Sequence, residues 1–233
     1  MNKEDFINST SELNIDINEK KLEMLEKYYQ LLEEENKKYN LTAITNKEDV
    51  YLKHFYDSLT LSKIIKLNSQ TLCDIGTGAG FPGLVLKIIF PNLKVTLVDA
   101  TEKKCNFLKI VIKELELKEI EVINERAEIY SKTVREKYDI VTSRAVAPLK
   151  HLLEYSIPLV KVNGNYIAMK SDITKEIENI EIYENKLNIK KEKEIVFKLP
   201  KENSLRTLLL YKKLKETNPK YPRKYNDIKK KEL

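Results

Sequence analysis

Short apolar runs alternate along the chain with segments in which apolar residues recur every three or four positions. Runs typical of strands cover residues 71–75, 94–99, 121–124, 138–142 and 165–169, and helical periodicity covers 84–90, 102–117 and 148–158. After a predicted helix over 174–187, two strand-like runs, 192–199 and 206–214, lie too close together for a helical crossover. The pattern predicts an α/β fold with a doubly wound, mostly parallel seven-stranded sheet that ends in an antiparallel hairpin at its edge.

The chain before the first predicted strand has helical patterns only. Asp16 and Glu19 fit a capping box at the start of a long helix. Thr45 and Glu48 are predicted to cap a second helix over about 47–67, and a short helix is expected near the N-terminus. We therefore expect an N-terminal helical lobe packed on the sheet (1–68), a sheet domain (69–216) and a basic C-terminal tail (217–233).

The formal net charge of +6 is concentrated at the C-terminal end of the chain. Residues 212–233 hold nine Lys or Arg and three Asp or Glu, and this surplus of six equals the net charge of the whole chain. A basic tail on a nearly neutral body indicates a polyanionic partner, nucleic acid before a membrane. The alternative is a solvated tail that only keeps the protein in solution.

Other features indicate where the protein works. The chain begins without an apolar leader, and its best apolar run, 84–90, is short and interrupted by Lys87. We therefore expect no signal peptide, no membrane span and a cytoplasmic location. Cys73 and Cys105 have no partners at metal-ligand spacing, so no metal site is expected. The absence of a surplus apolar stripe indicates a monomer.

Four of the five glycines lie within eight residues, between the first predicted strand and the following helix. Gly76, Gly78 and Gly80 let the backbone turn tightly against a ligand, beside the unpaired N–H groups at the start of the helix. Asp99 ends the second strand, where an acid commonly accepts both hydroxyls of a ribose. Asp74 is a candidate partner for an ammonium group. With the predicted sheet, these features favour an S-adenosylmethionine-dependent methyltransferase.

Two other enzyme classes share part of these patterns. The loop also matches the G-x-G-x-x-G fingerprint of nicotinamide enzymes, but about 70 residues precede the first strand and no room remains for a separate catalytic domain. His54, Asp57 and Ser58 share one helical face and have the residue types of a hydrolase triad. No oxyanion turn accompanies them, so a docking network between lobe and sheet is the favoured interpretation.

Seven short motifs follow one another over about residues 22–224. They are Tyr39–Ile44, His54 with Asp57–Leu59, Asp74–Gly83, Arg126–Glu128, Thr142–Ala147, Ala168–Lys170 and Tyr221–Lys224. In this order they resemble the bacterial small-subunit ribosomal RNA guanine-N7 methyltransferases, the RsmG (GidB) family. The resemblance implies the class I methyltransferase fold, S-adenosylmethionine as methyl donor, and small-subunit rRNA or the small ribosomal subunit as substrate. Carried over position by position, it implies cofactor contacts from Gly76, Phe81, Asp99, Ala100, Thr101, Ala127, Glu128 and Arg144.

Methyl transfer to guanine N7 needs no general base, because N7 already carries a free lone pair. Positioning and electrostatic control should then carry the rate. Arg144 is expected nearest the reaction, with Lys170 and Arg206 gripping the base or phosphates. Because the target edge must reach a buried methyl group, the base must leave its stack. Further RNA contacts are expected from Arg126, Arg223 and Lys224.

The end of the chain departs from the family pattern. Relatives tend to have a glycine and prolines after the Tyr-Pro-Arg-Lys step, whereas residues 225–233 have neither, which predicts a floppier end. Two alternatives to an rRNA guanine-N7 methyltransferase stay open from the sequence. One is a methyltransferase of the same fold with another substrate, and the other is a non-catalytic RNA-binding protein that keeps the cofactor pocket.

Overall fold

A seven-stranded sheet forms the centre of the computed structural model, which describes residues 1–174 and 176–233. The strand order is β3-β2-β1-β4-β5-β7-β6, and among these strands β7 alone runs opposite to the other six. The predicted fold class is confirmed, and the last strand of the chain lies inside the sheet, between β5 and β6. The strands are β1 (Thr71–Ile75), β2 (Lys94–Asp99), β3 (Ile120–Asn124), β4 (Tyr138–Arg144), β5 (Val160–Lys170), β6 (Ile189–Lys198) and β7 (Leu205–Lys213).

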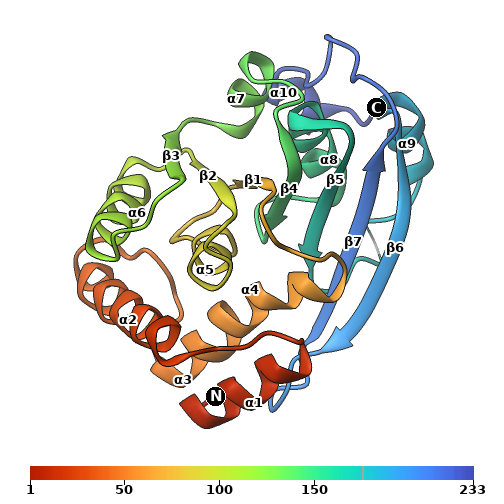
Figure 1. Cartoon of the computed structure of the whole chain (residues 1–233). Helices are drawn as coiled ribbons and strands as arrows, with labels where there is room; N and C mark the ends of the chain where they lie inside the picture. The colour runs from red at the N-terminus through yellow and green to blue at the C-terminus, as the bar shows by residue number, and fades with distance from the viewer. Residues whose placement is uncertain (175) are drawn as a thin grey trace.

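Helices cover both faces of the sheet and bury two separate apolar cores (Figure 1). Successive side chains of a strand point to opposite faces, so Ile140 belongs to one core and its neighbour Val141 to the other. The first core also contains the N-terminal lobe, α5 (Gly83–Ile89) and α6 (Glu102–Glu114). The second core contains α7 (Ala127–Thr133), α8 (Leu149–Ser156), the short 3₁₀-helix η3 (Ile157–Leu159) and α9 (Ile180–Leu187).

The N-terminal lobe packs on α5 through α2 and α4. Its second helical segment is not a regular α-helix, because the turn that carries Lys53 and His54 is a π-helix. Such wide turns are frequent at functional sites. The lobe consists of α1 (Lys3–Glu12), α2 (Glu19–Tyr39), α3 (Lys47–Asp49), the π-helix η1 (Val50–Tyr56), α4 (Asp57–Leu59) and the 3₁₀-helix η2 (Thr60–Lys63).

Both predicted capping boxes are wrong. Asn18 caps α2, with its side-chain oxygen accepting from the Lys21 N–H at 3.0 Å, and Asn46 caps α3. Asparagine is as good a cap as aspartate and better than threonine, and each Asn stands directly before the first helical residue. The predicted caps, Asp16 and Thr45, lie one or two positions too early.

Other element ends also differ from the prediction. The helix expected over 174–187 begins at Ile180, and residue 175 lies outside the described residues. The fifth strand begins at Val160 rather than 165, because an irregular register against β4 absorbs the polar stretch that resembles a turn. The helix expected over 47–67 ends at Lys63. The sequence patterns did not predict α7.

The C-terminal tail folds back onto the sheet domain and ends in a short helix, α10 (Tyr225–Lys230). The guanidinium of Arg223 donates two hydrogen bonds to the fully buried carboxylate of Glu154, from Nε to Oε1 at 2.9 Å and from Nη2 to Oε2 at 2.8 Å. Ile228 is buried, and the Leu233 N–H donates to the Tyr183 hydroxyl at 3.1 Å. The tail is therefore docked, in contrast to the floppy end expected from its composition.

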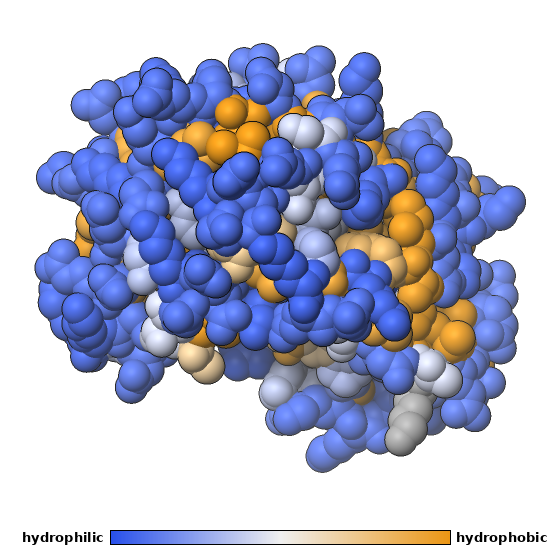
Figure 2. All heavy atoms as spheres, turned by 90° about the horizontal axis from the view of Figure 1, so that it is seen from below, coloured by the Kyte–Doolittle hydropathy of each residue, from blue (hydrophilic) through white to orange (hydrophobic). Residues whose placement is uncertain are grey.

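Charged and polar groups dominate the face of the molecule that is seen from below in Figure 2. Figure 2 shows hydrophilic side chains over most of one face, with hydrophobic atoms confined to small patches between them. Within residues 1–174 and 176–233, no helix has the length and apolar character needed to cross a membrane.

Candidate active site

Side chains pack closely against two positions of the glycine loop that follows β1. Gly76, Gly78 and Gly80 have φ of 68°, 62° and 109°, a region that residues with a Cβ rarely adopt. A Cβ on Gly76 would lie 2.5 Å from Val146, and one on Gly80 would lie 2.5 Å from the Tyr28 hydroxyl. The loop therefore needs glycine for its backbone conformation and, at these two positions, for space.

Asp74 holds this loop from behind. Its Oδ2 accepts hydrogen bonds from the Thr77 hydroxyl at 2.6 Å and from the Gly83 N–H at 2.8 Å. Its Oδ1 is buried and has no partner. Burial raises the pKa of Asp74 to about 6, because a buried carboxylate loses its hydration. A buried carboxylate oxygen without a donor is suited to an ammonium group or a water molecule.

Asp99 stands at the carboxyl end of β2 and joins it to the glycine loop. Its Oδ2 accepts from the Gly78 N–H at 2.9 Å, and its Oδ1 accepts from the Thr101 N–H at 2.8 Å. A carboxylate has about four acceptor positions. Two of them are used here, so the group keeps acceptor capacity for two hydroxyl donors.

A hollow of about 570 Å³, here named the donor hollow, opens beside Asp99 at the carboxyl ends of the strands. Its volume lies in the range of small-molecule sites. Among the lining residues that the sequence did not predict are Tyr155 from α8 and Tyr225 and Lys229 from α10, which no local pattern marks. The predicted residues that line it are Gly76, Asp99, Ala100, Thr101, Arg126, Ala127 and Glu128.

Five residues predicted to contact the cofactor do not line the donor hollow. Phe81 is buried and stacks on His54, with ring centroids 4.1 Å apart. Arg144 faces a different hollow. The other three, which shape or support the glycine loop, are Asp74, Gly78 and Gly80.

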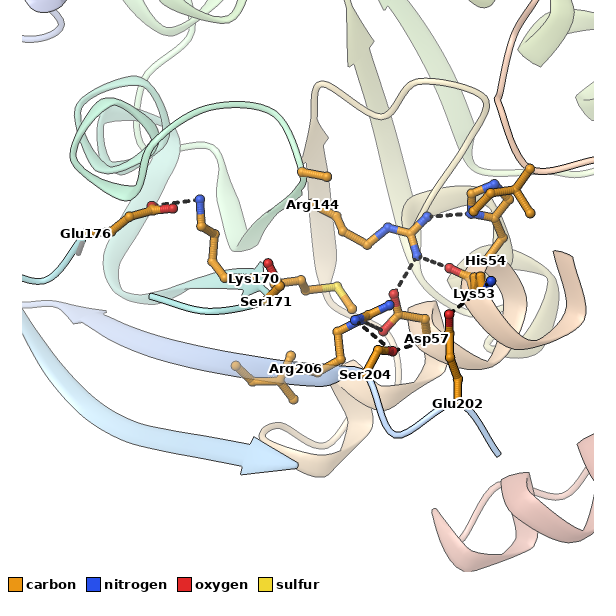
Figure 3. A pocket seen from close by; sticks show the side chains of 14 residues that line it. Lys53, His54, Asp57, Arg144, Lys170, Ser171, Glu176, Glu202, Ser204 and Arg206 are labelled. Carbon is orange, nitrogen blue, oxygen red and sulfur yellow. Dashed lines mark hydrogen bonds and ion pairs between the residues drawn. The ribbon is translucent and has the colours of Figure 1, made fainter. Parts of the chain in front are cut away.

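Figure 3 shows a second hollow of about 510 Å³, here named the acceptor hollow. Ala145 lines both, so its segment separates them. Its φ of 54° is uncommon for a residue with a Cβ, and such conformations cluster at functional sites. The hollow brings together the three predicted catalytic cations, Arg144, Lys170 and Arg206.

Asp57 ties two of these cations to the N-terminal lobe. Arg144 donates from Nη1 to Asp57 Oδ2 at 3.1 Å and to the Lys53 carbonyl at 2.9 Å. Arg206 donates from Nε to Asp57 Oδ1 at 3.1 Å. Figure 3 shows both guanidinium groups converging on this one carboxylate, which is 6% exposed. The geometry fixes both arginines at the wall of the hollow.

His54 completes this network as a neutral group. Its Nδ1 lies 3.1 Å from Arg144 Nη2, and a guanidinium only donates, so Nδ1 accepts. The ring proton is then on Nε2 and points to the Thr42 hydroxyl at 2.9 Å. Burial, and then the charge of Arg144, lowers the pKa of His54 to about 3. The Ser58 hydroxyl donates to the His54 carbonyl at 2.6 Å, within its own helical turn. The contacts of His54 and Asp57 with Arg144 of β4 link lobe and sheet, as expected of a docking network.

The remaining predicted cations have different surroundings. Lys170 donates to Glu176 at 2.7 Å and to the Ala147 carbonyl at 2.9 Å. Arg126 pairs with Glu128 at 2.5 Å on the rim of the donor hollow. The guanidinium of Arg223, 21% exposed, pairs with Glu154, and Lys224 is exposed. The RNA contacts expected from these two residues stay predictions.

No group of three or more His, Cys, Asp or Glu in the described part of the chain could hold a metal ion. The two cysteines are both buried and free.

Comparison with known proteins gives a family for this arrangement. A family model described as rRNA small subunit methyltransferase G matches residues 21–208. The chain is 47% identical over 228 residues to ribosomal RNA small subunit methyltransferase G of Bacillus cytotoxicus, covering 96% of this chain and 95% of that protein. The protein of the same name from Bacillus cereus is 46% identical over equal coverage.

Solved structures agree in fold at low identity. M. jannaschii TYW2 in complex with AdoMet has a TM-score of 0.57 and 14% identity, covering 74% of this chain and 80% of that one. A SAM dependent methyltransferase from Aquifex aeolicus has a TM-score of 0.52 and 16% identity, covering 71% and 93%. These structures establish the class I methyltransferase fold, and the relatives establish the family. The chain belongs to the rRNA small subunit methyltransferase G family.

Proposed function

We propose that this protein transfers the methyl group of S-adenosylmethionine to N7 of one guanine in small-subunit ribosomal RNA. By family and fold it is an S-adenosylmethionine-dependent rRNA methyltransferase. The target atom and the roles of single residues are the proposal. One observation supports it most: a glycine-loop hollow and a cation-lined hollow share a wall at Ala145.

The residues of the donor hollow fit the cofactor. Asp99 keeps acceptor positions for the two ribose hydroxyls. Asp74 lies behind the glycine loop and outside the hollow, so we propose that its unpartnered oxygen acts on the methionine ammonium through a water molecule. Gly76 leaves its part of the wall free of a side chain. When bound, S-adenosylmethionine supplies an electrophilic methyl group on a sulfonium. Residues after β1, at the end of β2 and in the turn after β3 would bind the cofactor and orient its methyl group.

The acceptor hollow fits a nucleophile that needs no deprotonation. Asp57 is shared by two guanidinium groups, and Glu202 pairs with Lys53 at 3.0 Å. Each acid of this hollow is thus already ion-paired and is poorly placed to accept a proton. In the transfer, the N7 lone pair forms the new bond and the sulfur keeps the electron pair of the bond that breaks. No proton has to move at the residues of this chain.

The cations orient the base and its backbone. Arg144, 13% exposed, can donate to guanine O6 without covering N7, and a donor to N7 itself would block the nucleophile. Lys170 and Arg206 lie in the same hollow and are suited to phosphate or base contacts. Because the substrate is ribosomal RNA, we propose that the protein acts in the cytoplasm, on free rRNA or on the small subunit, and as a monomer.

The test is methyl transfer followed by mapping. Small-subunit rRNA from cells that lack the protein is incubated with the purified protein and S-adenosylmethionine, then treated with borohydride and aniline, which cleave at N7-methylguanosine. We expect cleavage at a single guanine. Arg144→Ala should lower kcat by about 100-fold, as removal of one transition-state donor does. Its affinity for S-adenosylhomocysteine should be unchanged, because Arg144 lies outside the donor hollow.

Lys118→Ala, an exposed lysine away from both hollows, is the matched control and should keep full activity. Methyl incorporation at another base or atom would support a same-fold enzyme with another substrate. RNA binding without any methyl incorporation would support a non-catalytic RNA-binding protein. Either result overturns the proposal.

A further inference from the structure

We propose that Tyr225, on the C-terminal helix α10, forms the adenine end of the donor hollow, so that the docked tail is part of the cofactor site. This inference rests on the proposed function, because it assumes that the donor hollow holds S-adenosylmethionine. It concerns a segment whose composition predicted either a contact with a polyanion or a solvated basic tail. Tyr225 and Lys229 both line the hollow.

The strand order shows which end of the hollow takes the base. The glycine loop follows β1, Asp99 ends β2, and Arg126 follows β3, and these strands are neighbours in the order β3-β2-β1. A ligand with its amino-acid end at the glycine loop and its ribose at Asp99 therefore extends toward the turn after β3. That turn, 125–128, is where the adenine ring must lie.

Tyr225 lies at this turn. Its ring centroid is 4.4 Å from the guanidinium carbon of Arg126, and Lys229 Nζ lies 5.1 Å from the same ring. Figure 1 shows α10 beside α7, which begins directly after Arg126. Both cations lie over the ring of Tyr225 and bring hydrogen-bond donors to it. An adenine ring has a π-face that can contact the tyrosine or the guanidinium, and ring nitrogens that accept from the cations.

The C-terminal tail is anchored on both sides of Tyr225, which fixes the position of its ring beside the donor hollow. Arg223, two positions before Tyr225, is held by the fully buried Glu154 through a two-bond fork. Ile228, three positions after Tyr225, is buried. The aromatic ring thus lies between two anchored residues and is already ordered. Less conformational entropy is therefore lost when a base binds to it.

The chain contains no tryptophan, which allows a direct optical test. Tyr225→Trp places a single indole at the proposed contact, and Tyr39→Trp places one on an exposed tyrosine at the end of α2, which is 44% exposed. On addition of S-adenosylhomocysteine, the indole emission of Y225W should be quenched or shifted with saturation. The emission of Y39W should not change.

Calorimetry with the same probe measures the contribution of the ring. Tyr225→Ala should weaken S-adenosylhomocysteine binding about tenfold, as loss of one base-stacking aromatic does, and Tyr225→Phe should stay within about twofold. The same tenfold loss should appear with 5′-methylthioadenosine, which has the adenosine but lacks the amino-acid end. A loss confined to S-adenosylhomocysteine would place Tyr225 at the other end of the ligand and overturn the inference.

The two proposals fail in different ways. If the unaltered protein binds S-adenosylhomocysteine and Y225A, at an unchanged Tm, binds it equally well, the inference on Tyr225 is wrong and the proposed function stands. If the unaltered protein does not bind S-adenosylhomocysteine, the proposed function itself is wrong. If Y225A is unstable, the fluorescence of Y225W decides. An indole emission that does not change when S-adenosylhomocysteine is added overturns the inference.

Discussion

Replacing Asp57 with Asn tests how the acceptor hollow holds its arginines. Asp57 accepts from Arg144 and Arg206, both at 3.1 Å, and its side chain is 6% exposed. Asparagine keeps one oxygen but turns an amide N–H₂ toward the second guanidinium. One charge-assisted hydrogen bond is then lost, and two poorly solvated cations lose their counter-ion.

The magnitude follows from the burial of the three groups. Breaking a fully buried ion pair costs about 3–5 kcal/mol. Arg144 and Arg206 are 13% and 21% exposed, so water replaces part of the lost interaction. We therefore expect Asp57→Asn to lower the free energy of unfolding by about 2–4 kcal/mol, which for a chain of this size corresponds to a Tm lower by about 5–15 °C.

Urea unfolding and methyl-transfer kinetics check this prediction together. The matched control is Glu114→Gln, which breaks an exposed pair with Lys27 (46% and 44% exposed) and should cost less than about 1 kcal/mol. Asp57→Asn should also lower kcat, because Arg144 loses its orientation, while leaving S-adenosylhomocysteine affinity unchanged. If D57N is as stable and as active as E114Q, the reasoning about this network is refuted.

Three further predictions concern the glycine loop and the titrating groups around it. Gly80→Ala should lower the free energy of unfolding by about 2–5 kcal/mol, because backbone strain adds to a clash with the buried hydroxyl of Tyr28. Gly78→Ala has open space around it and should lower it by only about 1–2 kcal/mol in urea unfolding. The reverse order would contradict the loop geometry. Burial raises the pKa of Asp74 from 3.8 to about 6, so the folded chain keeps a proton that the unfolded chain releases, and stability falls as the pH rises through this range. The stability of the unaltered protein relative to Asp74→Asn should therefore drop by roughly 2 kcal/mol between pH 4 and pH 6, and a difference independent of pH would count against a buried carboxylate. The imidazole of His54, with its pKa lowered to about 3, should stay neutral from pH 5 to 8. ¹⁵N NMR checks this, with His151, the only other histidine of the sequence, as the internal comparison. A titration of His54 in this range would contradict its role as a hydrogen-bond acceptor.

The hydrophobic pattern predicts the sheet well, because its central strands are short, buried and separated by helices with clear periodicity. The glycine loop and Asp99 can also be predicted, since they lie within 25 residues of one another and their spacing follows from the strand-turn-helix geometry. Local rules were less reliable for the caps, where two asparagines stand within two positions of the residues expected to cap.

The acceptor hollow depends on contacts that no local pattern connects. Asp57 and Arg206 are 149 positions apart, and Glu154 and Arg223 are 69 apart. Each of these side chains is individually an ordinary charged residue, and only the folded chain brings them together. The same holds for Tyr225, whose lysine-rich surroundings are typical of a solvated tail although the structure places it against Arg126.

The measurement that tests the account most directly is a crystal structure of the protein with S-adenosylhomocysteine. We predict that the ligand occupies the donor hollow, with its ammonium toward the glycine loop, its ribose hydroxyls on Asp99 and its adenine against Tyr225, so that the sulfur lies nearest Ala145. Ligand bound elsewhere, or oriented with its adenine at the glycine loop, would contradict the central claim that this hollow presents a methyl group to the neighbouring acceptor hollow.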